Sequence, residues 1–204
     1  MAGIGLLGEP ANAKTHSSST CMSAADDLWV FGYGSLMWRP GFDYLERHEG
    51  RLIGAHRALC VYSFVHRGTP EKPGLVLGLD HGGACRGIVY RVAAQKREAT
   101  IEYLRRREQV TMVYRESYRT AWVDSDPKRQ VRALVYTIDR GHAQYAGRLP
   151  VAKQLHFVRQ GRGRSGPNRD YVIETVKSLE ALGYRETALH ELAEKLKGPH
   201  QSKP

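Results

Sequence analysis

The order of two hydrophobic patterns along the chain places the strongest constraint on its fold. Short segments rich in β-branched and aromatic residues supply most of the pattern before residue 140, whereas amphipathic helical segments dominate the rest of the 204 residues. Strands that precede helices, without regular alternation of the two, are typical of α+β folds. We therefore predict an α+β fold whose sheet closes partly into a barrel.

The individual elements follow from local periodicity and from the positions of Gly and Pro. The predicted strands cover residues 28–33, 58–62, 75–79, 86–92, 114–124 and 131–138. Turns are predicted at residues 81–83 and at Asp126 and Pro127, and loops at 66–74 and 161–167. The predicted helices cover residues 93–108, 149–160, 171–182 and 187–196, with Asn168 or Asp170 as the N-cap of the third.

The length of the chain fits one domain with short extensions. Residues 1–25 are mostly small and polar and predict a disordered leader, in which Met22 is an alternative start. Residues 26–197 then form the single domain, and residues 198–204 form a tail.

Composition argues against several classes of protein. No apolar run reaches the about 18 residues that a membrane-spanning helix needs, so we expect no membrane partner. Three cysteines, Cys21, Cys60 and Cys85, fit neither a disulfide framework nor a zinc site, so we predict no bound metal and a reducing, cytoplasmic compartment. The net charge of +10 suits an anionic small substrate. We expect no nucleic-acid partner because no recognition motif is present, although the basic stretch at 159–169 makes RNA binding an alternative.

The segment FGYGSL at residues 31–36 is the most unusual local stretch. Two glycines around a tyrosine, directly after a predicted strand, let the backbone adopt positive φ and approach a ligand closely. Consecutive amide groups in such a turn form a concave site for a carboxylate or phosphate. On spacing alone, a simple β-turn without a ligand explains the glycines equally well.

Glu108 is the candidate proton-transfer group. It ends the predicted helix of residues 93–108 behind three arginines. In that setting a carboxylate is either a solvated ion-pair partner or, inside a cleft, a group whose pKa is raised by burial. The isolated His56 and His66 have no partner at metal or catalytic-triad spacing and are expected to be structural. The sequence contains no GxSxG or HExxH motif.

Five motifs occur in one order along the chain. They are WVFGYGSLMW at 29–38, HRGTPEKPG at 66–74, GIVYRV at 87–92, YLRRRE at 103–108 and SGPNRDYV at 165–172. Together they resemble the ChaC family of γ-glutamylcyclotransferases, in its glutathione-specific branch. The resemblance implies a γ-glutamylcyclotransferase-like fold, which is a small, partly closed mixed β-barrel flanked by helices, with a substrate cavity over the YGSL loop.

The resemblance also implies a lyase that needs no cofactor. Such an enzyme cyclises the γ-glutamyl part of glutathione into 5-oxoproline and releases cysteinylglycine. Glu108 matches the family's catalytic glutamate, and Tyr171 is implied to line the substrate pocket. The loop residues implied to hold the γ-glutamyl group are Val30, Phe31, Gly32, Tyr33, Gly34, Ser35 and Leu36.

This chemistry agrees with the residues present. The substrate's own α-amine attacks its γ-carbonyl, so no enzyme nucleophile is required, and one carboxylate can handle both protons. Residues 109–114 depart from the relatives' pattern, so cyclisation of another γ-glutamyl peptide or of a γ-glutamyl-amine is an alternative. A catalytically silent binding or regulatory protein is a further alternative, against which the intact Glu108 argues.

Overall fold

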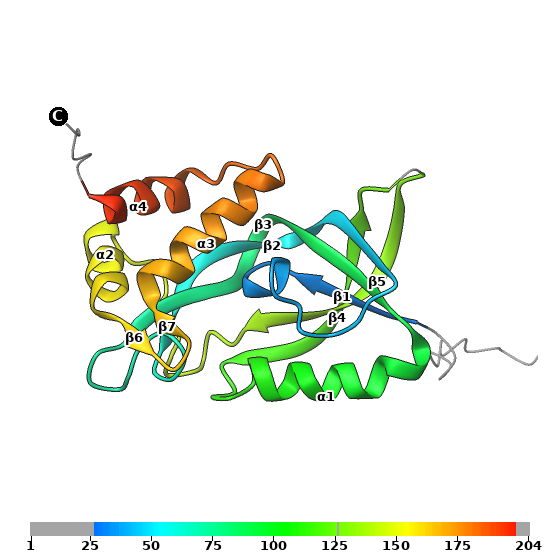
Figure 1. Cartoon of the computed structure of the whole chain (residues 1–204), viewed down its shortest axis with the longest axis horizontal. Coiled ribbons are helices and arrows are strands. Elements are labelled where there is room, and N and C mark those ends of the chain that lie inside the picture. The colour runs from blue at the N-terminus through cyan, green and yellow to red at the C-terminus, as the bar shows by residue number, and fades with distance from the viewer. Residues whose placement is uncertain (1–26, 126, 199–204) are drawn as a thin grey trace, which may run out of the picture.

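The structure, a computed structural model, describes residues 27–125 and 127–198. The leader predicted at 1–25, with Met22, and residues 199–204 of the predicted tail lie outside the described residues, as does Asp126 of the second predicted turn. Within the described part, five strands close into a β-barrel and four α-helices pack around it (Figure 1). The predicted α+β class is confirmed.

The barrel strands are joined in the order β1-β3-β2-β4-β5. They are β1 (Leu28–Gly32), β2 (Glu46–Ser63), β3 (Gly74–Val92), β4 (Tyr114–Val123) and β5 (Arg129–Ile138). Neighbouring strands are antiparallel except for β1 and β5, which pair in parallel through Trp29↔Ala133 and Val30↔Leu134. The barrel is therefore mixed, as predicted. It is also fully closed, because this pairing covers the last free strand edge.

Strands β2 and β3 are longer than the sequence pattern indicates. They pair along nearly their whole length, so the two strands predicted at 75–79 and 86–92 are one. The turn expected between them is instead a bulge, where Gly54, Gly82 and Gly83 all have positive φ and the register shifts. Glycine adopts this conformation readily, which lets the two-stranded ribbon bend without ending.

The helices lie on two sides of the barrel (Figure 1). They are α1 (Arg97–Glu108), α2 (Val151–Gln160), α3 (Asn168–Ala181) and α4 (Thr187–Lys197). Helix α1 runs along the bottom of Figure 1, whereas α2, α3 and α4 gather at the left, in contact with one another. The shorter elements are the 3₁₀ turns η1 (Ser35–Met37) and η2 (Ala94–Lys96) and the strands β6 (Arg162–Gly163) and β7 (Gly166–Pro167). Strands β6 and β7 form a small hairpin inside a segment predicted as a loop.

The start of α3 differs from the prediction. The helix begins at Asn168 rather than at Tyr171, and no side chain caps its N-terminus. The Asn168 side chain instead bonds to the backbone of Leu75 in β3. Its Oδ1 accepts from the Leu75 N–H at 2.6 Å, and its Nδ2 donates to the Leu75 carbonyl at 2.8 Å. This buried amide tethers α3 to the barrel, which explains why it is not available as a cap.

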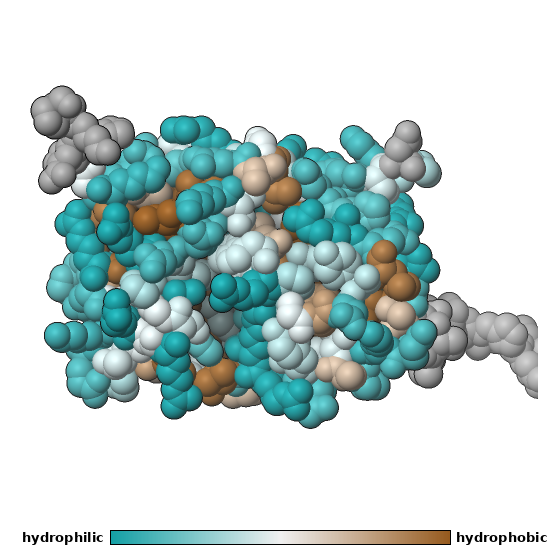
Figure 2. Space-filling model, in the orientation of Figure 1, coloured by the Kyte–Doolittle hydropathy of each residue, from teal (hydrophilic) through white to brown (hydrophobic). Residues whose placement is uncertain are grey.

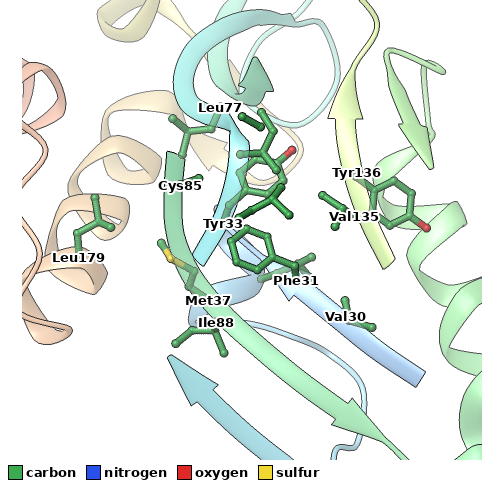
Figure 3. Close-up of a cluster of buried hydrophobic side chains, with 14 of the residues drawn as sticks. Val30, Phe31, Tyr33, Met37, Leu77, Cys85, Ile88, Val135, Tyr136 and Leu179 are labelled. Carbon is green, nitrogen blue, oxygen red and sulfur yellow. The ribbon is translucent and has the colours of Figure 1, made fainter. Parts of the chain in front are cut away.

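An apolar core fills the barrel and continues under the helices. Figure 3 shows part of this cluster, with Phe31, Ile88 and Val135 contributed by three different strands. Each of these side chains is at most 1% exposed. Leu179 of α3 belongs to the same cluster, so the helices and the barrel share one core.

Two cysteines, Cys60 and Cys85, are buried free thiols; Cys85 belongs to this core, and Cys60 belongs to a second, smaller apolar cluster. Burial raises the pKa of Cys60 to about 12 and that of Cys85 to about 11. Both thiols therefore stay protonated near neutral pH, which makes them poor nucleophiles.

The helices of the described part of the chain are all too short or too polar to cross a membrane.

Candidate active site

A cavity opens between the barrel, α1 and the β6–β7 hairpin. Its main chamber has a volume of about 440 Å³ and adjoins an inner recess of about 40 Å³. Four residues line both spaces: Ser35, Glu108, Tyr114 and Tyr171. Figure 2 shows a hollow near the centre of one face of the molecule, surrounded mostly by hydrophilic residues. The junction of chamber and recess is the candidate active site.

The loop after β1 forms one wall of the recess. Residues 33–36 all line it. The other three loop residues singled out by the sequence line neither space. Val30 and Phe31 are buried in the barrel core, and Gly32 is the last residue of β1. These three residues therefore support the base of the loop and do not face the cavity.

The two glycines of this loop allow close packing and not a left-handed turn. Neither has the positive φ expected from the sequence. A Cβ at Gly32 would lie 2.9 Å from the Cβ of Leu36, and a Cβ at Gly34 would lie 3.3 Å from the hydroxyl oxygen of Tyr171. Since both separations are tighter than ordinary van der Waals contact, only glycine lets the loop lie this close to its neighbours.

Residues 35–37 form η1, in which the Met37 N–H donates to the Gly34 carbonyl at 2.9 Å. The first amide groups of a helical turn have no acceptor inside that turn. In this loop they belong to residues that line the recess. Such consecutive N–H groups are suited to a carboxylate.

Arg107 ties the loop to α1. Its guanidinium donates to the Ser35 Oγ at 2.8 Å, to the Arg39 carbonyl at 2.7 Å and to the Tyr103 hydroxyl at 2.9 Å. The same guanidinium forms an ion pair with Glu108, with Nε 3.2 Å from Oε1. One side chain thus holds the loop and places a positive charge beside the carboxylate.

Arg57 of β2 holds the loop from the barrel side. Its side chain is fully buried, donates to the carbonyls of Tyr33 and Arg86, and forms an ion pair with Glu186. A buried guanidinium is tolerated only when it has such partners. The loop is therefore fixed from two directions before any ligand binds.

Glu108 is the only acidic side chain among those that line the two spaces. It ends α1, and its side chain is 18% exposed, so it is shielded from bulk water yet reachable from the cavity. Burial raises the pKa of this carboxyl, and Arg107 opposes part of that rise. A carboxylate with a raised pKa is suited to accept and return a proton near neutral pH.

Four tyrosines line the recess together with Glu108: Tyr33, Tyr114, Tyr136 and Tyr171. Burial raises the pKa of each phenol, and the charge of Glu108 raises it further. The phenols are therefore protonated at neutral pH. Tyr114 donates to the Leu77 carbonyl at 2.6 Å, whereas the Tyr171 hydroxyl accepts from the Leu77 N–H at 3.3 Å. Tyr171 can thus donate its own proton to a ligand.

No sequence pattern assigned a role to three further residues that line the main chamber, Arg39, Arg67 and Tyr114. His66, expected to be structural, also lines the chamber, and its Nδ1 lies 3.0 Å from the Ser165 Oγ. Arg67 lies inside a quoted motif and Arg39 directly follows one, so a signal for both existed. Tyr114 lies in no motif, and only the fold brings it to the recess.

The described residues contain no group of three or more His, Cys, Asp or Glu side chains that could hold a metal ion. The groups on the cavity walls include one carboxylate, several arginines, one imidazole, tyrosine hydroxyls and backbone amides. This set can bind an anionic ligand and transfer a proton.

Comparison with solved structures identifies the fold. A γ-glutamyl cyclotransferase specific to glutathione from yeast superposes with a TM-score of 0.76 at 21% sequence identity, covering 86% of this chain and 99% of that chain. At this level of identity the likeness establishes a shared fold.

Comparison with known sequences identifies the family. A protein of Escherichia coli (strain K12) named glutathione-specific gamma-glutamylcyclotransferase is 31% identical, over 90% of this chain and 79% of its own length. The Homo sapiens glutathione-specific gamma-glutamylcyclotransferase 1 is 32% identical, over 76% of this chain and 71% of its own. Residues 28–198 match the family described as ChaC-like protein. The chain therefore belongs to the ChaC-like family.

Proposed function

We propose that this chain is a γ-glutamylcyclotransferase that converts glutathione into 5-oxoproline and cysteinylglycine. The Escherichia coli and human relatives carry the name glutathione-specific gamma-glutamylcyclotransferase. In this chain, the observation that carries the proposal is the position of Glu108 at the junction between a small recess and a larger chamber. That division fits a substrate with a small anionic end group for the recess, an amide near the junction and a larger leaving part for the chamber.

In this proposal the α-carboxylate of the γ-glutamyl group enters the recess, whose small volume suits a group of that size, and the rest of the γ-glutamyl group lies at the junction. The α-carboxylate accepts hydrogen bonds from backbone amides of residues 34–36 and from the Tyr171 hydroxyl, which lies beside Gly34. Val30, Phe31 and Gly32 act indirectly, by supporting the loop from the barrel. The two arginine anchors of the loop mean that these donors need no reorganisation when the substrate enters.

Glu108 transfers the protons of the reaction. The α-ammonium must lose a proton before its nitrogen can attack the γ-carbonyl carbon. A new C–N bond then closes the five-membered ring, and the amide C–N bond breaks. The departing nitrogen must gain a proton, and one carboxylate between the two nitrogens can take a proton from the first and return it to the second. Backbone N–H groups stabilise the charge that develops on the γ-oxygen.

The attacking amine and the γ-carbonyl belong to one molecule, so the substrate itself brings the advantage of about 7–11 kcal/mol that a well-oriented intramolecular attack has over a bimolecular one. The enzyme contributes by holding the substrate in the folded conformation that realises this advantage. Every atom of both products comes from the substrate, so the reaction as written uses neither water nor a cofactor. The two buried free thiols, Cys60 and Cys85, fit a reducing compartment, and we place the reaction in the cytoplasm.

Incubation of the purified protein with glutathione, γ-Glu-Ala and γ-Glu-ε-Lys, followed by mass spectrometry of 5-oxoproline, tests the proposal. We expect product from glutathione and not from the other two compounds. Product from another compound alone would keep the cyclisation and replace the substrate. The absence of product from all three would reject the enzymatic proposal in favour of a silent binding or regulatory protein.

A further inference from the structure

The main chamber carries more positive charge than its own walls neutralise. Arg39, Arg67 and Arg107 line it, and Glu108 is its only acidic residue. Arg107 already forms an ion pair with Glu108. The other two guanidinium groups therefore face the chamber without a carboxylate on its walls.

Arg67 is a half-buried cation with no ion pair among the described residues. Its Nη1 donates to the Pro167 carbonyl at 3.0 Å, and its guanidinium carbon lies 5.4 Å from the centre of the Tyr171 ring. Burial lowers the pKa of Arg67; Tyr171 and, from beyond ion-pairing distance, Asp170 oppose that shift, and the charge of Arg39 adds to it. A partly desolvated charge beside a like charge is unfavourable unless an anion joins it.

Arg39 and Arg67 together form the positively charged wall of the chamber. The Arg39 side chain is exposed and has no hydrogen bond or ion pair in the described part of the chain. The nearby His66 does not add a full charge, because burial and the positive charge of Arg67 lower its pKa. The anion-binding capacity of this wall therefore belongs to the two arginines.

The distance from the recess to this wall matches the leaving part of the proposed substrate. The Tyr171 hydroxyl lines the recess, and Arg67 stands over the ring of the same tyrosine. Arg67 is thus about one aromatic side chain away from the junction. An extended dipeptide spans about 7 Å, so cysteinylglycine that leaves the junction reaches Arg67 with its terminal carboxylate.

We propose that Arg39 and Arg67 form a subsite for the C-terminal carboxylate of the leaving dipeptide. This inference rests on the proposed function and adds the residues that set its specificity. The planar guanidinium of arginine can donate two parallel hydrogen bonds to the two oxygens of a carboxylate. A neutral or cationic end group cannot accept both of these charge-assisted bonds. The subsite therefore selects γ-glutamyl peptides with a free C-terminus over γ-glutamyl-amines.

The test compares glutathione with glutathione whose glycine carboxylate is converted to the neutral amide. A charge-assisted hydrogen bond to a carboxylate corresponds to about a 10- to 100-fold preference. We expect the wild-type protein to favour glutathione over the amide by about this factor in kcat/KM. In Arg67→Met and in Arg39→Met, the preference collapses. Arg39→Met is the safer variant for folding, because the Arg39 side chain is exposed and has no hydrogen bond or ion pair among the described residues.

Arg132→Met is the matched control. Arg132 is an exposed arginine of β5 that stacks on Tyr118 and lines neither cavity. The Arg132→Met substitution also removes one positive charge from the protein, so it measures any general electrostatic effect. The preference of this variant for glutathione over the amide should equal that of the wild type. Equal use of glutathione and the amide by the wild type overturns the subsite. An equal loss on both substrates in the Arg39 and Arg67 variants also overturns it.

Equilibrium binding of cysteinylglycine and of its amide gives the same comparison without turnover. Tighter binding of the free acid by the wild type, lost in the Arg39 and Arg67 variants, supports the subsite even if glutathione is not cyclised. In that case the proposed function fails and the subsite stands. Equal binding of acid and amide by all proteins overturns the subsite, whatever the catalytic result.

Discussion

Replacement of Glu108 by glutamine should lower the turnover rate without lowering the stability of the fold. Its effects on catalysis and on folding can therefore be measured separately. Glutamine keeps the size of the side chain and an oxygen that can accept the 3.2 Å contact from the Arg107 Nε. It cannot take a proton at neutral pH. Loss of a positioned general base lowers a rate by about 10²–10⁴-fold, or about 3–5 kcal/mol of transition-state stabilisation. We expect turnover of glutathione to fall about 100-fold or more.

The same substitution should leave the protein at least as stable as the wild type at neutral pH. Burial raises the pKa of Glu108 in the folded state, so the folded protein holds this proton more tightly than the unfolded chain. The stability that the group contributes is present below its unfolded pKa and is lost as the pH rises through its folded pKa. The ionised carboxylate is therefore a cost at neutral pH, and the neutral amide removes it.

Initial rates of 5-oxoproline formation and thermal unfolding at neutral pH measure both effects. Glu102→Gln is the matched control, because Glu102 lies on the same helix with a side chain 68% exposed and paired to Arg106. Such a surface pair contributes about 0.3–0.5 kcal/mol, so the control should keep its activity and nearly its full Tm. Near wild-type turnover in Glu108→Gln would refute the assigned role. A large fall in Tm would show that the carboxylate is structural.

Three further perturbations test the geometry of the site. The kcat/KM of the wild type should fall as the pH drops through the raised pKa of Glu108, with a midpoint above that of an ordinary carboxyl, as measured in a pH–rate profile. Gly34→Ala places a methyl group 3.3 Å from the Tyr171 hydroxyl, and this overpacking should raise the KM for glutathione about tenfold and lower the free energy of unfolding by about 1 kcal/mol. Arg57→Met strands its partner Glu186, whose side chain is 31% exposed, and should lower the free energy of unfolding in urea by about 3 kcal/mol.

Each of these predictions has a contradicting result. If the midpoint of the pH–rate profile lay in the range of an ordinary carboxyl, Glu108 would be solvated and its pKa would not be raised. Gly141→Ala is the control for the loop glycine, because its Cβ would meet only Asp139, at 3.4 Å. An equal change of KM in both glycine variants would remove the steric argument. Glu186→Gln, which keeps an acceptor for Arg57, should cost less than Arg57→Met, and a larger cost would contradict the burial argument.

Local patterns predicted the elements that short segments specify. The apolar and aromatic runs place β1, β4 and β5 close to their observed ends, and the helix predicted at residues 187–196 matches α4 to within one residue. The long ribbon of β2 and β3 was not predicted. Gly82 and Gly83 have the local signature of a turn, and only their pairing opposite Gly54 makes them a bulge.

The candidate site likewise contains residues that motifs predicted and residues that only the fold brings to the cavity. The residues of the YGSL loop, Glu108 and Tyr171 were singled out from motifs, and the structure places them around one recess. Tyr114 reaches the same recess from β4 without any motif. Val30 and Phe31 are both buried in the apolar core, so their place in a motif does not bring them to the cavity.

The amino-acid sequence by itself determined the fold class, most of the helices and strands and the chemical groups available to the site, because strand and helix periodicity and turn chemistry are local properties. Only the tertiary structure decided which of these groups meet. Closure of the barrel and the packing of α1 and α3 against it bring residues from distant parts of the chain to one recess. Burial in that recess, and no feature of the YLRRRE motif, raises the pKa of Glu108.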